Sequence, residues 1–358
     1  MASNTHNHVV IMAGGIGSRF WPMSTPDRPK QFIDALGKGR TFIQQTYDNF
    51  APLVSPDHVW VVTNARYKEL VQEQLPDIPA GNILLEPCRR NTAPCIAYVA
   101  WRIKKQDPKA NLVVTPSDHF IQQPDTFRQV IREALAFTAE SDAILTLGMQ
   151  PTRPETGYGY IQADLSAPSL RNKHIFRVDS FKEKPDLSTA MQYIKHKEYF
   201  WNSGIFVWSV HTIVNSLRIY APEIAEIFEN IFPILGSSQE QKTIDAEFPK
   251  CPNISIDYAI LEKADEIFVI PADFGWSDVG TWNSLLTLAD KDKDGNAAIG
   301  EHIDLYETHN CIVHTTQQRR VVVQGLDDCI VAERDGVLLI CKLTEEQRIK
   351  DFSASTEK

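Results

Sequence analysis

The sequence predicts an α/β fold followed by a small β domain, and two patterns in its 358 residues support this prediction. First, short apolar runs rich in β-branched residues alternate with longer segments of helical pattern. These runs are nearly continuous, which is typical of strands that helices cover on both faces of a parallel sheet. Second, the chain after Gly295 changes to short β-rich pieces. We therefore expect a large α/β domain over residues 1–290, with a mixed, mainly parallel sheet, and a small β domain over residues 291–358.

The alternation runs through four strand and helix pairs before it becomes irregular. Strands are expected at 8–12, 59–63, 83–86 and 112–115, and the helices that follow them at 41–50, 66–75, 92–105 and 126–139. Ligands bind beyond the carboxyl ends of such strands, which is where Gly14, Glu86 and Asp118 fall. The following section is interpreted as an insertion that faces a substrate, with strands near 144–147, 158–161, 175–182, 204–210 and 266–271 and helices near 188–197, 211–232, 237–248 and 255–264.

Composition and charge narrow the classes of function. No apolar run is long enough to span a bilayer, and the N-terminus lacks a signal-peptide pattern, so a soluble, cytoplasmic protein is expected. The six cysteines are dispersed without a C-x-x-C pair, which argues against a zinc site and a disulfide framework. A formal net charge of −10 disfavours nucleic acid and membrane as partners. It still allows a local pocket for phosphates.

A glycine-rich loop follows the first strand directly. Gly14, Gly15 and Gly17 lie within four residues and allow close approach of the backbone, so amide N–H groups can point at phosphate oxygens. Arg19 and Lys30 add positive charge at fixed distances after the glycines. The loop is therefore predicted to bind an anion.

Three other interpretations of this loop fit its residues less well. The dinucleotide-binding fingerprint would need glycine where Phe20 stands, and the P-loop pattern has no match in the chain. An ordinary glycine-rich surface turn is the remaining alternative. The spacing to Pro22 and to Pro29 and Lys30 disfavours it.

With its later motifs, this loop resembles the nucleotidyltransferase signature G-G-x-G-[ST]-R-x-x-P…P-K of the sugar-nucleotide pyrophosphorylases. Within that family the chain resembles the group that makes GDP-mannose, and the resemblance is strong over roughly residues 8 to 290. The later motifs, taken jointly and in this order, are EPCRRNTAP at 86–94, PSDH at 116–119, GYGYI at 157–161, FKEKP at 181–185, WNSGIF at 201–206, SIDY at 255–258 and GWSDVG at 275–280.

The resemblance implies a fold and a reaction. The fold is a Rossmann-like, GT-A-like nucleotidyltransferase domain followed by a short left-handed β-helix. The reaction is transfer of GMP from GTP to mannose 1-phosphate, giving GDP-mannose and pyrophosphate, by Mg²⁺-assisted in-line attack of the sugar phosphate on the α-phosphorus. Some relatives carry a further isomerase domain, which is not expected within these 358 residues. A homodimer is expected from the resemblance alone.

The resemblance also implies roles for individual residues. Arg19, Lys30, Asp118 and Asp278 are the expected catalytic residues, and the two aspartates are expected to hold Mg²⁺. Because the sugar phosphate is already ionised at neutral pH, no general base is needed, and catalysis depends on positioning and charge. The nucleotide is expected to contact Gly14, Gly15, Gly17, Ser18, Arg19, Lys30, Glu86, Asn91, Thr92 and Ser117, and the sugar phosphate to contact Gly157, Gly159, Glu183, Lys184 and Asn202.

Several alternatives stay open at this point. Asp118 and Asp278 could cap local turns or helices, and Lys184 could be a solvated surface lysine. The pair His6 and His8 has a chelating spacing, which is interpreted as incidental. The chain could also be a related pyrophosphorylase for another NTP or sugar 1-phosphate, or a silent relative that binds GDP-mannose as a regulatory subunit. The presence of both aspartates and both loop cations disfavours the silent relative.

Overall fold

The computed structural model describes residues 6–316 and 320–356, which fold into two compact units. The first unit comprises Met1–Gly14, Tyr47–Pro116 and Ile121–Trp276, and the second comprises Gly15–Thr46, Ser117–Phe120 and Ser277–Lys358. The chain changes unit within α1 (Phe42–Phe50), β5 (Phe120–Ile121) and β11 (Trp276–Ser277). The glycine-rich loop therefore groups with the C-terminal residues.

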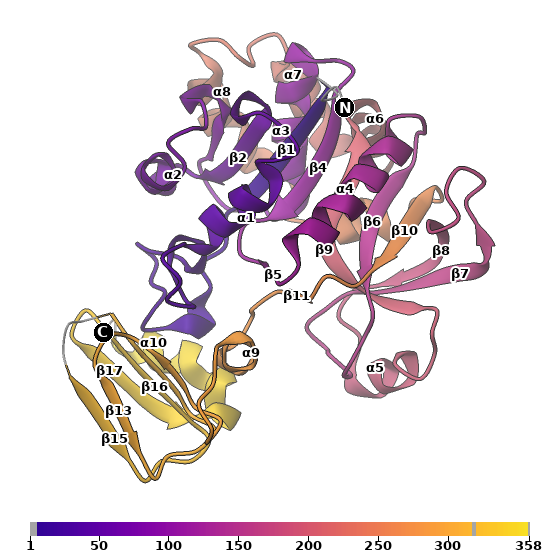
Figure 1. Cartoon of the computed structure of the whole chain (residues 1–358). Helices are drawn as coiled ribbons and strands as arrows, with labels where there is room; N and C mark the ends of the chain where they lie inside the picture. Colours follow the sequence, from indigo (N-terminus) through magenta and orange to yellow (C-terminus); the bar gives the residue numbers. More distant parts are fainter. Residues whose placement is uncertain (1–5, 317–319, 357–358) are drawn as a thin grey trace. The chain divides into compact units, whose positions relative to one another are not determined.

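A nine-stranded sheet forms the centre of the first unit (Figure 1). Its strand order is β3 (Ile83–Glu86), β2 (Val59–Asn64), β1 (Asn7–Ala13), β4 (Asn111–Pro116), β9 (Tyr199–Ser209), β6 (Ile144–Met149), β10 (Ile267–Ala272), β8 (Phe176–Lys182) and β7 (Tyr160–Pro168). Val10 lies in the main core cluster, and Val9 and Ile11, which alternate with it and face the opposite side, are buried as well. The prediction of strands buried on both faces is confirmed for β1.

The sheet is mixed, as expected, but only part of it is parallel. Parallel pairs join β3, β2, β1 and β4, and also β6 and β10. By contrast, β9 is antiparallel to β4, β6 and β7, and β8 is antiparallel to β7 and β10. The expectation of a mainly parallel sheet is therefore wrong beyond β4. After β6, some consecutive strands, such as β7 and β8, are joined by short connections. A short connection permits antiparallel pairing of the strands that it joins.

Helices cover this sheet. α3 (Thr92–Gln106), α6 (Val210–Tyr220) and α7 (Pro222–Ile231) pack on one another in the main core, and α4 (Pro124–Thr138) crosses one face of the strands in Figure 1. The helix expected at 211–232 is two helices, because Pro222 cannot donate a backbone hydrogen bond and starts a new helix. Further helical elements of this unit include α2 (Lys68–Gln74), α5 (Leu187–Tyr193), α8 (Glu240–Glu247) and the π-helical turn η7 (Asp257–Leu261).

Short parallel strands build the C-terminal part of the second unit. One sheet has the order β12 (Ala297–Ile299), β14 (Ile312–Thr315), β16 (Cys329–Arg334) and β17 (Val337–Lys342), and a second pairs β13 (Ile303–Tyr306) with β15 (Val321–Gln324). All these pairs are parallel except β16 with β17. Between the two sheets Val313, Val323 and Val331 form a small core.

The glycine-rich loop belongs to the second core of this unit. Phe20 in η1 (Ser18–Phe20) lies 5.5 Å, between ring centroids, from Trp282 at the start of α9 (Trp282–Leu288). The same cluster contains Ile312 and Ile349, from β14 and α10 (Ile349–Thr356). The loop conformation is thus fixed by apolar contacts with residues more than 250 positions later in the chain.

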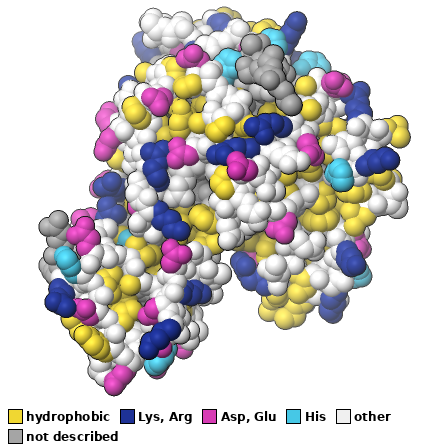
Figure 2. All heavy atoms as spheres, in the orientation of Figure 1, with side chains coloured by type: hydrophobic (Ala, Val, Ile, Leu, Met, Phe, Trp, Pro, Cys, Tyr) yellow, Lys and Arg dark blue, Asp and Glu magenta, His cyan; other side chains and the backbone are white. Residues whose placement is uncertain are grey.

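The surface carries charged side chains of both signs. On the face drawn in Figure 2, Lys and Arg side chains are interspersed with Asp and Glu. Among the described helices, none has both the length and the apolar character needed to cross a membrane.

Candidate functional site

In the second unit, the Lys30 ammonium lies among three oxygens from two distant motifs. Nζ donates to the Asp118 carboxylate (2.9 Å) and carbonyl (3.1 Å) and to the Asp278 carbonyl (2.7 Å). The side chain is 4% exposed, and Nζ also lies 5.0 Å from the centroid of the Phe42 ring. An ammonium has three protons, and here each has an oxygen acceptor. Lys30, Asp118 and Asp278, three of the expected catalytic residues, therefore form one cluster.

Gly17 is required for this arrangement. Its φ is +70°, and a Cβ atom at this position would lie 2.4 Å from the Cβ of Lys30. The Lys30 amide donates to the Ile16 carbonyl at 3.2 Å, which brings the two segments together. The glycine of the motif therefore serves both the backbone conformation and the close packing of the lysine.

The other predicted loop residues lie at the surface. Gly15, Ser18 and Arg19 are exposed, and an Arg19 Nη1 proton is donated to the Gly280 carbonyl at 3.3 Å. Ser117, by contrast, is 3% exposed. Because Gly280 follows Asp278 by two residues, Arg19 and Lys30 both contact the GWSDVG motif.

Burial and the neighbouring charged groups determine the pKa values of Asp118 and His119 in this cluster. Burial on its own would raise the pKa of the Asp118 carboxyl, but the Lys30 ammonium and His119 hold it below its usual value. Burial lowers the pKa of His119 despite the opposing effect of Asp118 and Asp278, so the imidazole is neutral at pH 7. The Asp118 side chain is 33% exposed. This carboxylate is therefore ionised and open to a ligand.

Asp278 does not cap the helix that follows it. The N-cap of α9 is Thr281, whose side chain forms a reciprocal capping box with Ser284. Asp278 instead accepts a hydrogen bond from the Gly280 amide at 3.0 Å. The alternative that Asp278 caps this helix is excluded, while the bond from Gly280 shows that it does cap a local turn.

In the first unit, Glu86 ends β3 and presents a buried carboxyl. The residue is 6% exposed, and its Oε1 atom has no hydrogen-bond partner among the described residues. Burial raises the pKa of Glu86 to about 7, against a smaller opposite effect of a hydrogen bond with Cys95. A Cβ atom on Gly14 would lie 3.7 Å from Glu86 Oε2, so the start of the loop and this carboxyl are neighbours.

Asn91 and Thr92 form the start of α3. Asn91, with φ +67°, is the N-cap, and its side chain accepts from the Thr92 amide at 2.9 Å. The Thr92 hydroxyl accepts from the Ile256 amide at 2.8 Å. This second bond connects the expected nucleotide region to the SIDY motif.

The expected sugar-phosphate residues also meet in the first unit. Asn202 donates its backbone N–H to the Gly159 carbonyl at 2.8 Å. A Cβ atom on Gly159 would lie 2.5 Å from Glu183 Oε2. The Glu183 side chain is 8% exposed and pairs with Lys184, which is 60% exposed. Gly157 lies two residues before Gly159 and donates its N–H to Glu155 at 3.1 Å. A side chain at position 159 would therefore displace the Glu183 carboxylate from its present position.

The sequence prediction missed one residue of this group, Asp257. Its Oδ1 atom accepts a hydrogen bond from Asn202 Nδ2 at 3.2 Å. Burial, and next the Glu183 carboxylate, raise the pKa of Asp257 to about 6. The signal was present in the SIDY motif, but the motif alone does not indicate which other segment it contacts.

Backbone conformation marks the same segments. Asn91, Lys184 and Val279 have φ values of 67°, 45° and 46°, a region that side chains other than glycine rarely adopt. Each lies in one of the motifs singled out by sequence, whereas four further residues with positive φ lie in the C-terminal part, outside these motifs: Glu307, Asn310, Asp328 and Asp335. Such conformations persist where surrounding contacts enforce them, and they concentrate at functional sites.

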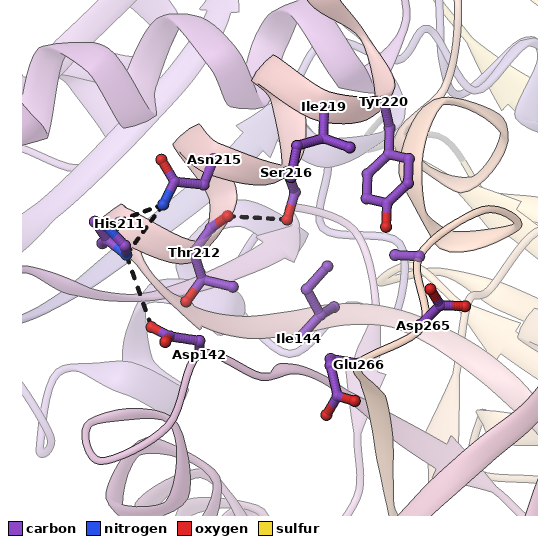
Figure 3. Close-up of a pocket in the computed structure, with 11 residues that line it drawn as sticks. Asp142, Ile144, His211, Thr212, Asn215, Ser216, Ile219, Tyr220, Asp265 and Glu266 are labelled. Atoms are coloured by element: carbon purple, nitrogen blue, oxygen red, sulfur yellow. Dashed lines mark hydrogen bonds and ion pairs between the residues drawn. The ribbon is translucent and has the colours of Figure 1, made fainter.

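A hollow of about 280 Å³ lies elsewhere in the first unit and contains none of the predicted site residues (Figure 3). It lies where β6 and β10 begin, beside α6. In Figure 3, His211 lies between Asn215 and Asp142, and Asp265 and Glu266 lie along the opposite side. With three carboxylates in its lining, this hollow is not suited to a phosphate ligand.

Comparisons with known proteins agree with the motif assignments. The family described as nucleotidyl transferase matches residues 8–295. Mannose-1-phosphate guanylyltransferase of Escherichia coli is 35% identical over 348 residues, which cover 96% of this chain and 74% of that protein. Mannose-1-phosphate guanylyltransferase RfbM of Salmonella typhimurium is 37% identical over 354 residues, which cover 96% and 72%.

A solved structure agrees as well. The crystal structure described as mannose-1-phosphate geranyltransferase from Thermus thermophilus superimposes with a TM-score of 0.87 at 29% identity, covering 99% of this chain and all of that one. The match extends over the α/β part and the small β part alike. The chain belongs to the nucleotidyl transferase family, among the mannose-1-phosphate guanylyltransferases.

Proposed function

We propose that this protein transfers GMP from GTP to mannose 1-phosphate, giving GDP-mannose and pyrophosphate. The names of its relatives support this reaction, and so do the three groups of site residues described above. The presence of Lys30, Asp118 and Asp278 in one cluster argues for an active enzyme rather than a silent binding protein. The substrates are accordingly a nucleoside triphosphate and a sugar phosphate.

The proposal that the base is guanine rests on the Oε1 atom of Glu86, which has no hydrogen-bond partner among the described residues. A buried acceptor without a partner destabilises the free protein, and a ligand that donates to it recovers that free energy. Guanine offers two adjacent donors, N1–H and the N2 amino group, which match one carboxylate. Adenine presents an acceptor at N1, which an ionised carboxylate repels. Glu86 is thus the proposed recognition residue for guanine.

The proposed roles of the other residues follow from their exposure and charge. Arg19, exposed beside Gly280, contacts the triphosphate, and Lys30 holds the Asp118 carboxylate in place and adds positive charge near it. Lys184, which is largely exposed, binds the phosphate of the sugar. Glu183 accepts hydrogen bonds from sugar hydroxyls. None of these groups needs to remove a proton, since the attacking phosphate is already ionised.

A divalent cation fits the cluster of the second unit. The described residues offer no group of three metal ligands, which suits an ion held by two carboxylates and completed by substrate phosphates. Asp118 and Asp278 would hold Mg²⁺, which, when bound, supplies positive charge to the reacting phosphates and helps to orient them. The hard oxygen atoms of both side chains match that ion.

The finer architecture is part of the same proposal. We infer that residues 291–358 form a short left-handed β-helix after a Rossmann-like, GT-A-like domain at 1–290. The parallel pairs among β12, β14 and β16 and between β13 and β15 support the helix, and the family match that ends at residue 295 supports the boundary. We also propose a cytoplasmic location, from the sequence pattern of the N-terminus, and a homodimer, from the family resemblance of the motifs.

One assay tests the function. The protein is incubated with Mg²⁺, pyrophosphatase and each NTP against a panel of sugar 1-phosphates, and NDP-sugar and phosphate are measured. We expect the highest kcat/KM for GTP with mannose 1-phosphate. Absence of turnover with every pair would contradict the enzyme assignment, and a preference for ATP or UTP would contradict the assignment of guanine.

A further inference from the structure

The side-chain amide of Asn202 is held by contacts at both ends. Its Oδ1 atom accepts from Thr146 Oγ1 at 2.9 Å and from the Gly204 amide at 3.2 Å. One proton of Nδ2 is donated to Asp257 at 3.2 Å. These three contacts fix which end of the amide is the donor, and one N–H of Nδ2 is left without a partner among the described residues.

Asp257 is itself held rigidly. It begins the π-helical turn η7, a rare backbone form that is frequent at functional sites. The residue before it, Ile256, donates its amide to Thr92 Oγ1, and Ala93 donates to the Ile254 carbonyl at 3.1 Å. The start of α3 therefore fixes the segment that carries the carboxylate.

We propose that Asp257 is a positioning residue for the sugar 1-phosphate, because it holds the Asn202 amide so that the remaining N–H is kept for a sugar hydroxyl. The inference rests on the proposed function, since it names the sugar as the ligand of this amide. If the aspartate were absent, both Nδ2 protons would be without a protein partner, and the amide would lose one of its three orienting bonds.

The charge of Asp257 makes this effect depend on pH. Burial raises the pKa of Asp257 to about 6, as does Glu183 to a smaller extent, while Lys184 acts in the opposite direction. Ser255 donates a hydrogen bond that favours the ionised form. At pH 7.5 the carboxylate is an ionised, strong acceptor, whereas at pH 5.5 it is largely protonated and accepts more weakly.

The test compares Asp257→Ala in the unmodified protein and in an Asn202→Ala background. At pH 7.5 we expect Asp257→Ala to raise the KM for mannose 1-phosphate about tenfold, the size of one lost hydrogen bond to a charged group. The KM for GTP should stay within about twofold of its original value. In the Asn202→Ala background, the second substitution should change the KM for the sugar by less than about twofold, because the amide it positions is gone.

The pH profile gives a readout that a purely structural role would not produce. The ratio of KM values between the variant and the unmodified protein should fall from about ten at pH 7.5 towards one at pH 5.5. The titration of the sugar phosphate itself cancels in this ratio, since both proteins use the same substrate. Asp257→Leu, which has a similar size but cannot accept a hydrogen bond, replaces the alanine variant in every arm if that variant does not fold. Asp245→Asn, on the exposed side of α8, is the matched control.

Two outcomes would overturn the inference. An unchanged KM for mannose 1-phosphate in the Asp257 variants would show that the carboxylate has no part in sugar binding. An equal increase in both backgrounds would show that it does not act through Asn202. A lack of turnover by the unmodified protein would instead contradict the proposed function.

Discussion

The two units each contain a lysine paired with a carboxylate, but the two pairs differ in burial. Lys30, paired with Asp118, is 4% exposed and donates to three oxygens. Lys184, paired with its neighbour Glu183, is 60% exposed, while that glutamate is 8% exposed. The same chemical pair is thus a fixed part of the fold in one unit and an open binding group in the other.

Because of this difference, substitutions of the two lysines can separate effects on folding from effects on ligand binding. Removing one partner of a buried ion pair leaves an uncompensated charge in the interior, which costs several kcal/mol. An exposed lysine contributes little to folding, so its removal affects what it binds. Lys30 variants should therefore lose both stability and activity, and Lys184 variants should lose activity alone.

The largest expected effect comes from Asp278→Asn. We expect turnover to fall by about 10³-fold, because one of two proposed metal carboxylates is neutralised. The thermal midpoint should change little, since an asparagine oxygen can still accept from the Gly280 amide. Steady-state kinetics and calorimetry measure the two effects. Near-normal rates would exclude Asp278 from the metal site.

Next in size is the contrast between Lys30→Met and Lys184→Met. Lys30→Met should lower the free energy of unfolding by about 1 to 3 kcal/mol, because the Asp118 carboxylate, which is 33% exposed to solvent, loses its ammonium partner. Lys184→Met should change it by less than about 0.5 kcal/mol while raising the KM for mannose 1-phosphate. Urea denaturation of both variants checks this. Equal losses of stability would show that the difference in burial does not matter.

A third prediction concerns His8, which belongs to neither pair. Burial, and next the stacked ring of His58 at 4.3 Å, lower the pKa of His8 to about 4. The other titratable groups that act on His8 are His6 and Asp107. The Asp107 carboxylate accepts hydrogen bonds from both His6 (2.8 Å) and His8 (3.4 Å). Because the folded-state pKa is lowered, the contribution to stability is complete above about pH 6.5 and is lost as the pH falls towards 4.

The size of this loss is about 3 kcal/mol for a shift of this extent. Urea denaturation of the unmodified protein and of His8→Gln between pH 7 and pH 4 measures it, and the variant should show a shallower decline. Identical pH dependence in both proteins would contradict the assignment. The pair His6 and His8, interpreted as an incidental chelate, is thus a hydrogen-bonded anchor on Asp107.

The smallest expected effect concerns the pH dependence of GTP binding. The pKa of Glu86 lies at about 7 in the free protein, mainly because of burial, and guanine donors stabilise the ionised form. The KM for GTP should therefore fall by a few-fold between pH 6 and pH 8, and this change should be lost in Glu86→Gln. An unchanged pH profile in that variant would exclude the carboxyl from base recognition.

Many strands and helices of the first unit could be predicted from the sequence, because each is indicated by a short run of neighbouring residues. The strands that begin at Asn7, Val59, Ile83 and Asn111 are continuous apolar runs, and the helices after them have clear periodicity. Errors arose where a single residue interrupts a pattern, as Pro222 does within the expected helix at 211–232. They also arose where pairing direction depends on connections rather than on composition, as in β9.

The sequence singled out candidate residues of the site, but it did not predict which of them contact one another. The motifs identified Lys30, Asp118 and Asp278, yet the three oxygens around the ammonium come from segments 88 and 248 residues away from it. The contact of Asn202 with Asp257 spans 55 residues, and nothing in either motif indicates the partner. Such contacts depend on the packing of whole elements, which a single sequence does not reveal.

In the proposed reaction the sugar phosphate attacks the α-phosphorus of GTP, and isotope transfer distinguishes this attack from transfer of the γ-phosphate. The protein is incubated with Mg²⁺, mannose 1-phosphate and GTP labelled in either the α- or the γ-phosphate. The account predicts that the α-label appears in GDP-mannose and the γ-label in pyrophosphate. Transfer of the γ-label to the sugar, or no labelled sugar product from either nucleotide, would contradict it.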